Sequence, residues 1–347
     1  CWVWLRNPRA STARRVQLLT WVTLFLTFDL ILFGAFTRLT DSGLGCPDWP
    51  GCYGHASPVG AQQAIEFAQT QMPTGPVTHT KAWIEMVHRY MAMAVGGLIL
   101  TLAAFAWWRK LRGDGGSDVA LPSFTLLWVC LQGAFGALTV TMKLFPLIVT
   151  LHLMGGLALL ALLTVQVQRQ RLHSGLAMSV PLCPWLYGLV WLGLALLSLQ
   201  ILLGGWVSTN YAVLACNTFP QCQNSWWPQM DFTQGFTLWR HLGMNASGEP
   251  LTFESLTAIH YVHRLAAYAV LAYLGVLAWQ LRRVTACSSA AHGLLAVLLL
   301  QLVTGLSNVV LDWPLLAAVL HTGGAAALLV ILVGLLSGAR VSRAVLN

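Results

Sequence analysis

The sequence predicts an all-α polytopic membrane protein in which eight transmembrane helices form two tandem four-helix bundles. Three observations lead to this fold class. Of the 347 residues, 57% are hydrophobic and only 9% are charged, whereas soluble domains carry about 25% charged residues. Several apolar runs reach the ~20 residues that cross a bilayer core, and sequence landmarks recur at a nearly constant offset. This composition excludes a soluble enzyme, a secreted disulfide scaffold and a disordered chain.

Eight apolar segments are long enough to be membrane-spanning helices. They cover residues 17–37, 84–108, 121–142, 146–167, 184–207, 256–279, 290–310 and 314–336. An even number of spans places both ends of the chain on one side of the membrane. Most Lys and Arg residues lie in short connections on that side, for example Arg109, Lys110 and Arg112. The positive-inside rule therefore predicts that the N-terminal segment 1–16 and the C-terminus face the cytoplasm or the mitochondrial matrix.

Two long connections, 38–82 and 208–255, then face the periplasm or the intermembrane space. Long loops over a rigid scaffold commonly carry function. The net charge of +8 does not indicate nucleic-acid binding, because the basic residues flank apolar segments. The sequence has no glycine-rich phosphate-binding loop of the ATP or nicotinamide type. The partner that this composition requires is the lipid bilayer, and no nucleic acid is expected.

An internal repeat relates the two halves of the chain. The paired landmarks, offset by 169, 170 or 175 residues, are Gly34 with Gly204, Cys46-x5-Cys52 with Cys216-x5-Cys222, His88-Arg89 with His263-Arg264, Gln132 with Gln301, Gly136 with Gly305, and His152 with His321. Helices that merely share a Leu- and Ala-rich composition would not have matching Cys and His. The repeat predicts an N-terminal bundle over 17–167 and a C-terminal bundle over 184–336, side by side in the same orientation.

Four histidines within the apolar segments are the main candidate ligands, because ionisable residues inside a membrane usually mark a functional site. They are His88, His152, His263 and His321, all near the outer boundary. Two imidazoles per bundle can clamp a planar metal ligand, and haem fits that arrangement. Zinc would need a third protein ligand near each pair, and the sequence offers none. Any single histidine is also explained by hydrogen bonds between helices, but four at repeated positions are not.

Two arginines directly follow ligand candidates. Arg89 and Arg264 can extend toward the outer face of the membrane. There they would pair with haem propionates, or they would simply anchor their helices at the membrane interface.

One position differs between the halves in a way that matters for chemistry. Glu85 precedes His88 by three residues and lies on the same helix face, whereas its counterpart in the second half is His260. A carboxylate beside a metal ligand can accept a proton, so Glu85 is the candidate catalytic residue. The alternative is a carboxylate favoured by the helix dipole. Asp29, a further acid within the first helix, has no evident partner.

The cysteines of the outer loops form two pairs, Cys46 with Cys52 and Cys216 with Cys222. The outer compartment is oxidising, so two short disulfides are expected. A ring this small contributes little through chain entropy, which leaves both a structural role and a redox role open.

These motifs together resemble the heme A synthase family. The segment from Thr37 to Leu44, continuing through Cys46 to Pro50, resembles that family's first outer loop. Glu85-Met86-Val87-His88-Arg89 and Ile259-His260-Tyr261-Val262-His263-Arg264 are similar to its two haem-ligand motifs, and His152 and His321 fall where the partner ligands would be. The resemblance extends over nearly the whole chain.

The resemblance implies an eight-helix, two-bundle enzyme that oxidises a methyl group of haem O to a formyl group, giving haem A for cytochrome c oxidase. By resemblance, His263 and His321 would hold haem b, while His88 and His152 would form the haem O site with Glu85 as catalytic acid. Cys46 and Cys52 match the family's outer-loop cysteines. The resemblance also implies an inner-membrane location with haem sites toward the outer face, haem O synthase and oxidase assembly factors as partners, and room for a homo-oligomer.

Two other function classes fit parts of the pattern. A di-haem b cytochrome that oxidises quinol would use the same histidines, but it gives no role to the difference between Glu85 and His260. A transporter or haem exporter would explain the repeat, yet the polar residues cluster near one face and the apolar segments show no breaks in mid-membrane.

Overall fold

Eight long apolar helices dominate the computed structural model, which describes residues 6–7, 10–113 and 118–341. Each of the eight is long and apolar enough to cross a membrane, which confirms the predicted all-α membrane fold. Of the segment 1–16, residues 1–5 and 8–9 lie outside the described part. The helices are α2 (Thr12–Leu39), α4 (His79–Leu111), α5 (Ala120–Thr141), α6 (Pro146–His173), α7 (Pro184–Thr209), α9 (Phe253–Leu281), α10 (Ser288–Val310) and α11 (Leu315–Gly338).

Polar caps, rather than hydropathy, set where α4 and α9 begin. The hydroxyl of Thr78 accepts a hydrogen bond from the backbone N–H of Lys81 at 3.2 Å, and Thr252 accepts one from Ser255 at 3.3 Å. Such caps satisfy N–H groups that have no partner within the helix. Both helices therefore start before the predicted residues 84 and 256, in segments that are too polar to be recognised as membrane-spanning. As a result, His88 lies deeper along its helix than predicted.

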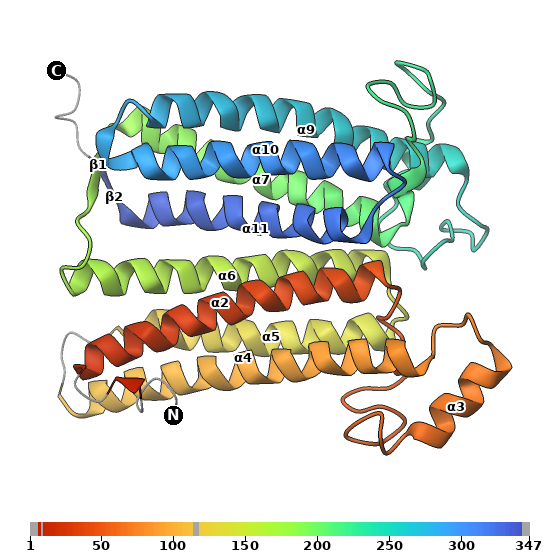
Figure 1. Cartoon of the computed structure of the whole chain (residues 1–347), viewed down its shortest axis with the longest axis horizontal. Helices are drawn as coiled ribbons and strands as arrows, with labels where there is room; N and C mark the ends of the chain where they lie inside the picture. The colour runs from red at the N-terminus through yellow and green to blue at the C-terminus, as the bar shows by residue number, and fades with distance from the viewer. Residues whose placement is uncertain (1–5, 8–9, 114–117, 342–347) are drawn as a thin grey trace.

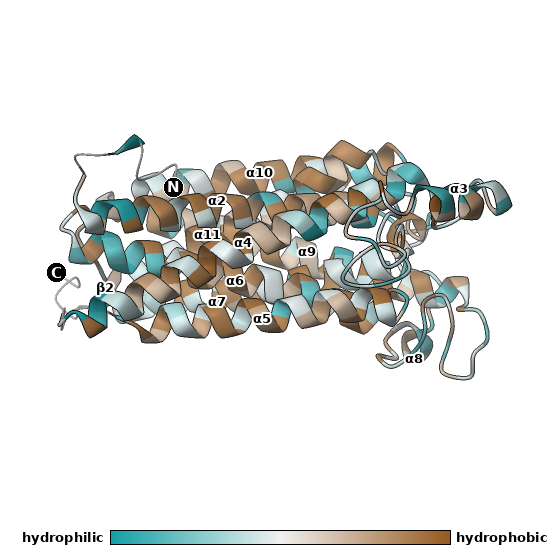
Figure 2. Ribbon diagram, turned by 90° about the horizontal axis from the view of Figure 1, so that it is seen from below, coloured by the Kyte–Doolittle hydropathy of each residue, from teal (hydrophilic) through white to brown (hydrophobic). Residues whose placement is uncertain are grey.

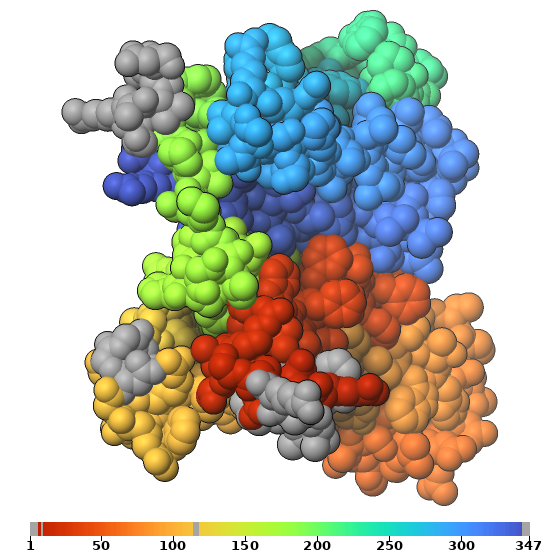
Figure 3. All heavy atoms as spheres, turned by 60° about the vertical axis from the view of Figure 1, so that its left-hand side comes forward, coloured from red at the N-terminus to blue at the C-terminus, as the bar shows by residue number. Residues whose placement is uncertain are grey.

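The helices pack as two groups of four. In the first group, α2 contacts α4 and α6, and α5 also contacts both; in the second, α7 and α10 each contact α9 and α11. The groups meet where α2 and α6 contact α11 and where α6 contacts α7. The first group lies below the second in Figure 1, and Figure 3 shows the same division from another side. The eight long helices are thus divided into two neighbouring groups of four.

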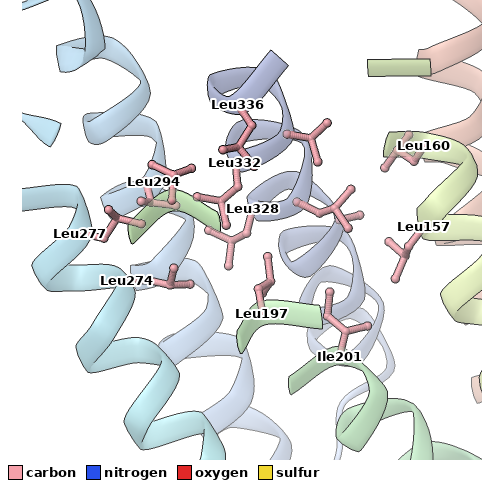
Figure 4. Packing of buried hydrophobic residues seen from close by; sticks show 14 of the residues in the cluster. Leu157, Leu160, Leu197, Ile201, Leu274, Leu277, Leu294, Leu328, Leu332 and Leu336 are labelled. Carbon is pink, nitrogen blue, oxygen red and sulfur yellow. The ribbon is translucent and has the colours of Figure 1, made fainter. Parts of the chain in front are cut away.

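Tightly packed leucines fill the interior between the helices. The largest buried cluster draws on both groups, and Figure 4 shows leucines of α6, α7, α9, α10 and α11 within it. Figure 2 shows hydrophobic residues over the middle of the helices and hydrophilic residues gathered near both ends. The 28 residues of α2 rise about 42 Å, more than a hydrocarbon core of ~30 Å. The helix therefore has enough length to span the bilayer.

Both long connections lie at one end of the bundle, at the right in Figure 1. The first contains α3 (Gln62–Gln71), and the second contains η1 (Ala212–Leu214) and α8 (Phe232–Gly235), three short elements that the apolar pattern does not predict. At the opposite end, β1 (Val180–Leu182) pairs in parallel with β2 (Ala339–Val341), near the short η2 (Thr285–Cys287). This pairing joins the connection between the two groups to the segment that follows α11.

Candidate haem sites

Each candidate ligand histidine of the second group lies against a glycine of a neighbouring helix. A Cβ atom built on Gly204 of α7 would lie 2.9 Å from Cε1 of His263 on α9. A Cβ atom on Gly305 of α10 would lie 3.1 Å from Cε1 of His321 on α11. These distances are shorter than ordinary carbon–carbon contacts of about 3.5–4.0 Å. Glycine thus leaves the space that the imidazole ring occupies.

The first group repeats the arrangement. A Cβ atom on Gly34 of α2 would lie 3.0 Å from Cε1 of His88 on α4, and one on Gly136 of α5 would lie 3.5 Å from Cε1 of His152 on α6. In the sequence these glycines are visible only as repeat landmarks. Their contact with histidine depends on how the helices pack and could not be predicted.

The sequence predicts that the histidines act in pairs within each group, and that pairing stays a prediction. His88 of α4 and His152 of α6 belong to the first group of helices, and His263 of α9 and His321 of α11 belong to the second. No described residue forms a hydrogen bond with Nε2 of any of these four rings. Because neutral imidazole nitrogen is a good iron ligand, these Nε2 atoms could bind haem iron.

The residues fit haem better than a compact metal site. Within the described ranges, no group of three or more His, Cys, Asp or Glu side chains is arranged to hold a metal ion, so the zinc alternative finds no support there. Each helical group instead offers two imidazoles, a ligand type that would hold haem iron. Nδ1 of His88 and Nδ1 of His152 are also buried without a hydrogen-bond partner.

The glycine contacts lead to a graded prediction within one group of helices. Gly34→Ala is expected to displace the ring of His88, because its Cβ would lie 3.0 Å from the ring, whereas Gly136→Ala creates an ordinary contact at 3.5 Å. Forcing an extra methyl group into a packed site costs about 1–3 kcal/mol. Titrating the purified variants with haem and following the Soret absorbance should show weaker binding for Gly34→Ala only. Equal weakening in both variants would contradict the prediction.

Glu85 connects α4, which carries the candidate ligand His88, to the first outer loop. It is only 3% exposed, and Oε2 accepts a hydrogen bond from the backbone N–H of Cys46 at 2.8 Å. Oε1 forms an ion pair with Arg89. The first turn of α4 contains no acidic residue, and the effect of a helix dipole fades beyond that turn. The loop and Arg89, rather than the dipole, account for the position of Glu85.

His260 makes the equivalent contact in the second group. The backbone N–H of Cys216 lies 3.3 Å from Nδ1 of His260, and the carbonyl oxygen of Ala212 lies 3.0 Å from the same atom. Like Glu85, His260 is buried. Because an imidazole can perform this loop contact, anchoring the loop does not by itself require a carboxylate at Glu85.

Arg89 and Arg264 reach toward the outer loops, and their terminal nitrogens donate to loop carbonyls. The acceptors at 2.5–3.2 Å are Asp48, Pro50 and Gly51 for Arg89, and Cys216, Thr218 and Gln221 for Arg264. Each arginine therefore fixes one Cys-x5-Cys loop above the histidines. Propionate pairing by either residue stays a prediction.

The structure contains both expected disulfides, Cys46–Cys52 and Cys216–Cys222. The two loops share a further local feature, because Cys52 forms an antiparallel β-bridge with His55, and Cys222 forms one with Ser225. A structural role and a redox role both stay predictions for these disulfides.

Asp48 shapes the first loop, a role that the sequence motifs did not predict. Its carboxylate accepts hydrogen bonds from the backbone N–H groups of Tyr53 at 2.6 Å and Gly54 at 2.7 Å. Short acidic side chains often close turns in this way, which is the signal that could have found it. Asp29 in α2, by contrast, forms no hydrogen bond or ion pair with any described residue.

Comparison with known proteins assigns this geometry to a family. A model of the COX15-CtaA family, described as cytochrome oxidase assembly protein, matches residues 17–333. The chain belongs to this family. It is 40% identical over 320 residues to a heme A synthase of Shewanella oneidensis, an alignment that covers 91% of this chain and 94% of that relative.

More distant relatives carry the same name. A heme A synthase of Bradyrhizobium sp. (strain ORS 278) is 29% identical over 340 residues, covering 90% of this chain and 87% of its own. One of Halalkalibacterium halodurans is 27% identical over 300 residues, covering 84% and 86%. The resemblance seen in the motifs is confirmed, and heme A synthase is the function that family and relatives support.

Proposed function

We propose that this protein oxidises a methyl group of haem O to a formyl group, giving haem A for cytochrome c oxidase, and is therefore an oxidoreductase. The observation that carries the proposal is the difference between Glu85 and His260 at equivalent positions of two sites that share their main residues. Each group of helices has a pair of histidines, a pair of glycines and an arginine-anchored disulfide loop. Only the first group has a buried carboxylate, Glu85, where the second has His260.

The proposed division of labour follows this difference. The N-terminal bundle, 17–167, binds haem O through His88 and His152. The C-terminal bundle, 184–336, binds haem b through His263 and His321. Haem b, when bound, supplies an electron acceptor near the substrate.

In this proposal Glu85 accepts protons as the methyl group is oxidised. Its ion pair with Arg89 and its hydrogen bond from Cys46 hold the carboxylate on the helix face that carries His88.

We further propose that the protein spans a bacterial plasma membrane or a mitochondrial inner membrane with both termini on the cytoplasmic or matrix side. The haem sites then lie toward the outer face, beneath the two long loops. Haem O synthase would supply the substrate and oxidase assembly factors would receive the product, and a homo-oligomer is compatible with this arrangement.

Mass-spectrometric identification of the bound haems tests the function directly. The protein would be purified in detergent from a host that makes haem O, and the extracted haems analysed. We expect haem b together with haem O or haem A. Haem b alone would favour a quinol-linked di-haem cytochrome, and a protein without any haem would favour a transporter; either result would overturn the proposal.

A further inference from the structure

The two pairs of histidines differ in the side chains that lie against Nδ1, the ring nitrogen that would not bind iron. In the C-terminal bundle, the hydroxyl of Thr304 lies 3.0 Å from Nδ1 of His321. The same hydroxyl donates a hydrogen bond to the carbonyl oxygen of Leu300 at 2.7 Å. Its proton is thus already used, and its oxygen is free to accept the Nδ1–H of His321. That tautomer leaves Nε2 unprotonated, as an iron ligand must be.

His263 has a similar neighbour in Gln200. The side-chain Nε2 of Gln200 lies 3.0 Å from Nδ1 of His263 and donates to its carbonyl oxygen at 3.1 Å. Oε1 of the same amide is buried without a hydrogen-bond partner. With the amide turned so that Oε1 faces the ring, Gln200 would accept the Nδ1–H of His263 when Nε2 binds iron, and it would give up its hydrogen bond to the carbonyl oxygen. Gln301 also donates to the carbonyl oxygen of His321 at 2.7 Å.

The N-terminal bundle lacks these partners. Nδ1 of His88 and Nδ1 of His152 are buried and form no hydrogen bond. The repeat offsets explain why: Leu30 stands 170 residues before Gln200, and Phe135 stands 169 residues before Thr304. Neither side chain has a hydrogen-bonding group. The difference therefore follows from the residues at four positions, which are Leu30, Phe135, Gln200 and Thr304.

A hydrogen bond at Nδ1 of a metal-binding histidine fixes the orientation of the ring and raises the basicity of Nε2. Losing such a hydrogen bond typically lowers metal affinity by about 10–100-fold. Ligands without one hold iron more weakly. A resident cofactor needs histidines that have a hydrogen-bond partner at Nδ1, whereas a substrate that must leave as product needs histidines without one.

We infer that Thr304 and Gln200 are positioning residues that make haem in the C-terminal bundle a permanent cofactor, and that Phe135 and Leu30 keep the N-terminal bundle exchangeable. This inference rests on the proposed function, because it assigns haem b and haem O to the two bundles. It explains how two related sites can separate a cofactor from a substrate that share the same iron-porphyrin core.

The rate of haem dissociation tests this inference. In a His88→Ala background, which removes an N-terminal ligand, the rate of haem loss to apomyoglobin would be followed. Thr304→Val keeps the side-chain shape but removes the acceptor, and we expect haem loss to become about 10-fold faster or more. Thr304→Ser keeps the hydroxyl and should retain the original rate. Unchanged loss from Thr304→Val would overturn the inference.

The reduction potential provides a readout that a merely structural role would not move. Losing the acceptor makes the imidazole a weaker donor to ferric iron, so the midpoint potential of Thr304→Val should rise, while Thr304→Ser should match the parent. Potentials equal in all three proteins would contradict a role in ligand positioning.

The reverse substitution tests the same inference in the other bundle. Phe135→Thr, made in a His321→Ala background, should slow haem loss from the N-terminal site, and an unchanged or faster rate would count against the inference. Failure of the proposed function has a different signature: a His88→Ala protein that holds no haem despite intact His263 and His321 would overturn the haem assignment itself.

Discussion

Glu85→Ala is expected to abolish the conversion of haem O to haem A while the purified protein still binds haem. General acid–base groups contribute about 10²–10⁴-fold to rate, so the yield of haem A should fall by at least ~100-fold. Haem binding should persist because the histidines and their glycine contacts do not involve Glu85. The measurement is the ratio of haem A to haem O in membranes that contain the variant.

A structural explanation of such a loss needs its own control. Glu85→Ala also leaves the backbone N–H of Cys46 without its acceptor, and an unsatisfied buried donor costs about 1–3 kcal/mol. Glu85→His is the matched control, because His260 makes this loop contact with an imidazole in the other half. We expect Glu85→His to keep the fold and the bound haem but to remain inactive. Normal haem A production by either variant would rule out a catalytic carboxylate at this position.

His321→Ala is expected to remove haem b from the C-terminal bundle and to stop turnover. A bis-imidazole site that loses one axial ligand changes both its affinity and its spectrum. The haem absorbance per protein should fall by roughly half if both bundles are loaded in the parent. Absorption spectra of the purified protein, with pyridine haemochromogen quantification, provide the measurement.

His292→Ala is the appropriate control for that experiment. His292 lies on α10 in the same bundle but is exposed, and its ring contacts the backbone oxygen of Ser288. Haem content and turnover should be unchanged in this variant. If His321→Ala retained the full haem spectrum of the parent, the ligand assignment would be wrong.

Much of the fold could be predicted because a membrane-spanning helix requires a long run of apolar residues, which is visible in the sequence. Only long apolar helices satisfy their backbone groups inside a bilayer, so all eight spans are visible as apolar runs. Their ends are less visible, as the capped starts of α4 and α9 show, because a cap such as Thr78 is a local polar interaction. The short α3 and the β1–β2 pair lie outside the apolar runs and leave no comparable signal.

For the site, the sequence determined which residue types are present and that they occur twice. The repeated histidines, the cysteine pairs and the replacement of Glu85 by His260 are all visible without a structure, because their rarity in apolar segments makes each one informative. The sequence also determined the family resemblance that the comparisons confirm.

Only the tertiary structure decided what these residues touch. It placed Gly204 against His263 and Gly34 against His88, joined Glu85 to Cys46 across 39 positions of the chain, and showed that Thr304 supports His321. Contacts of this kind depend on how far each helix is rotated and shifted against its neighbour. Packing and hydrogen bonding between helices set that geometry, whereas hydropathy, which dominates the sequence signal, is nearly the same on every face.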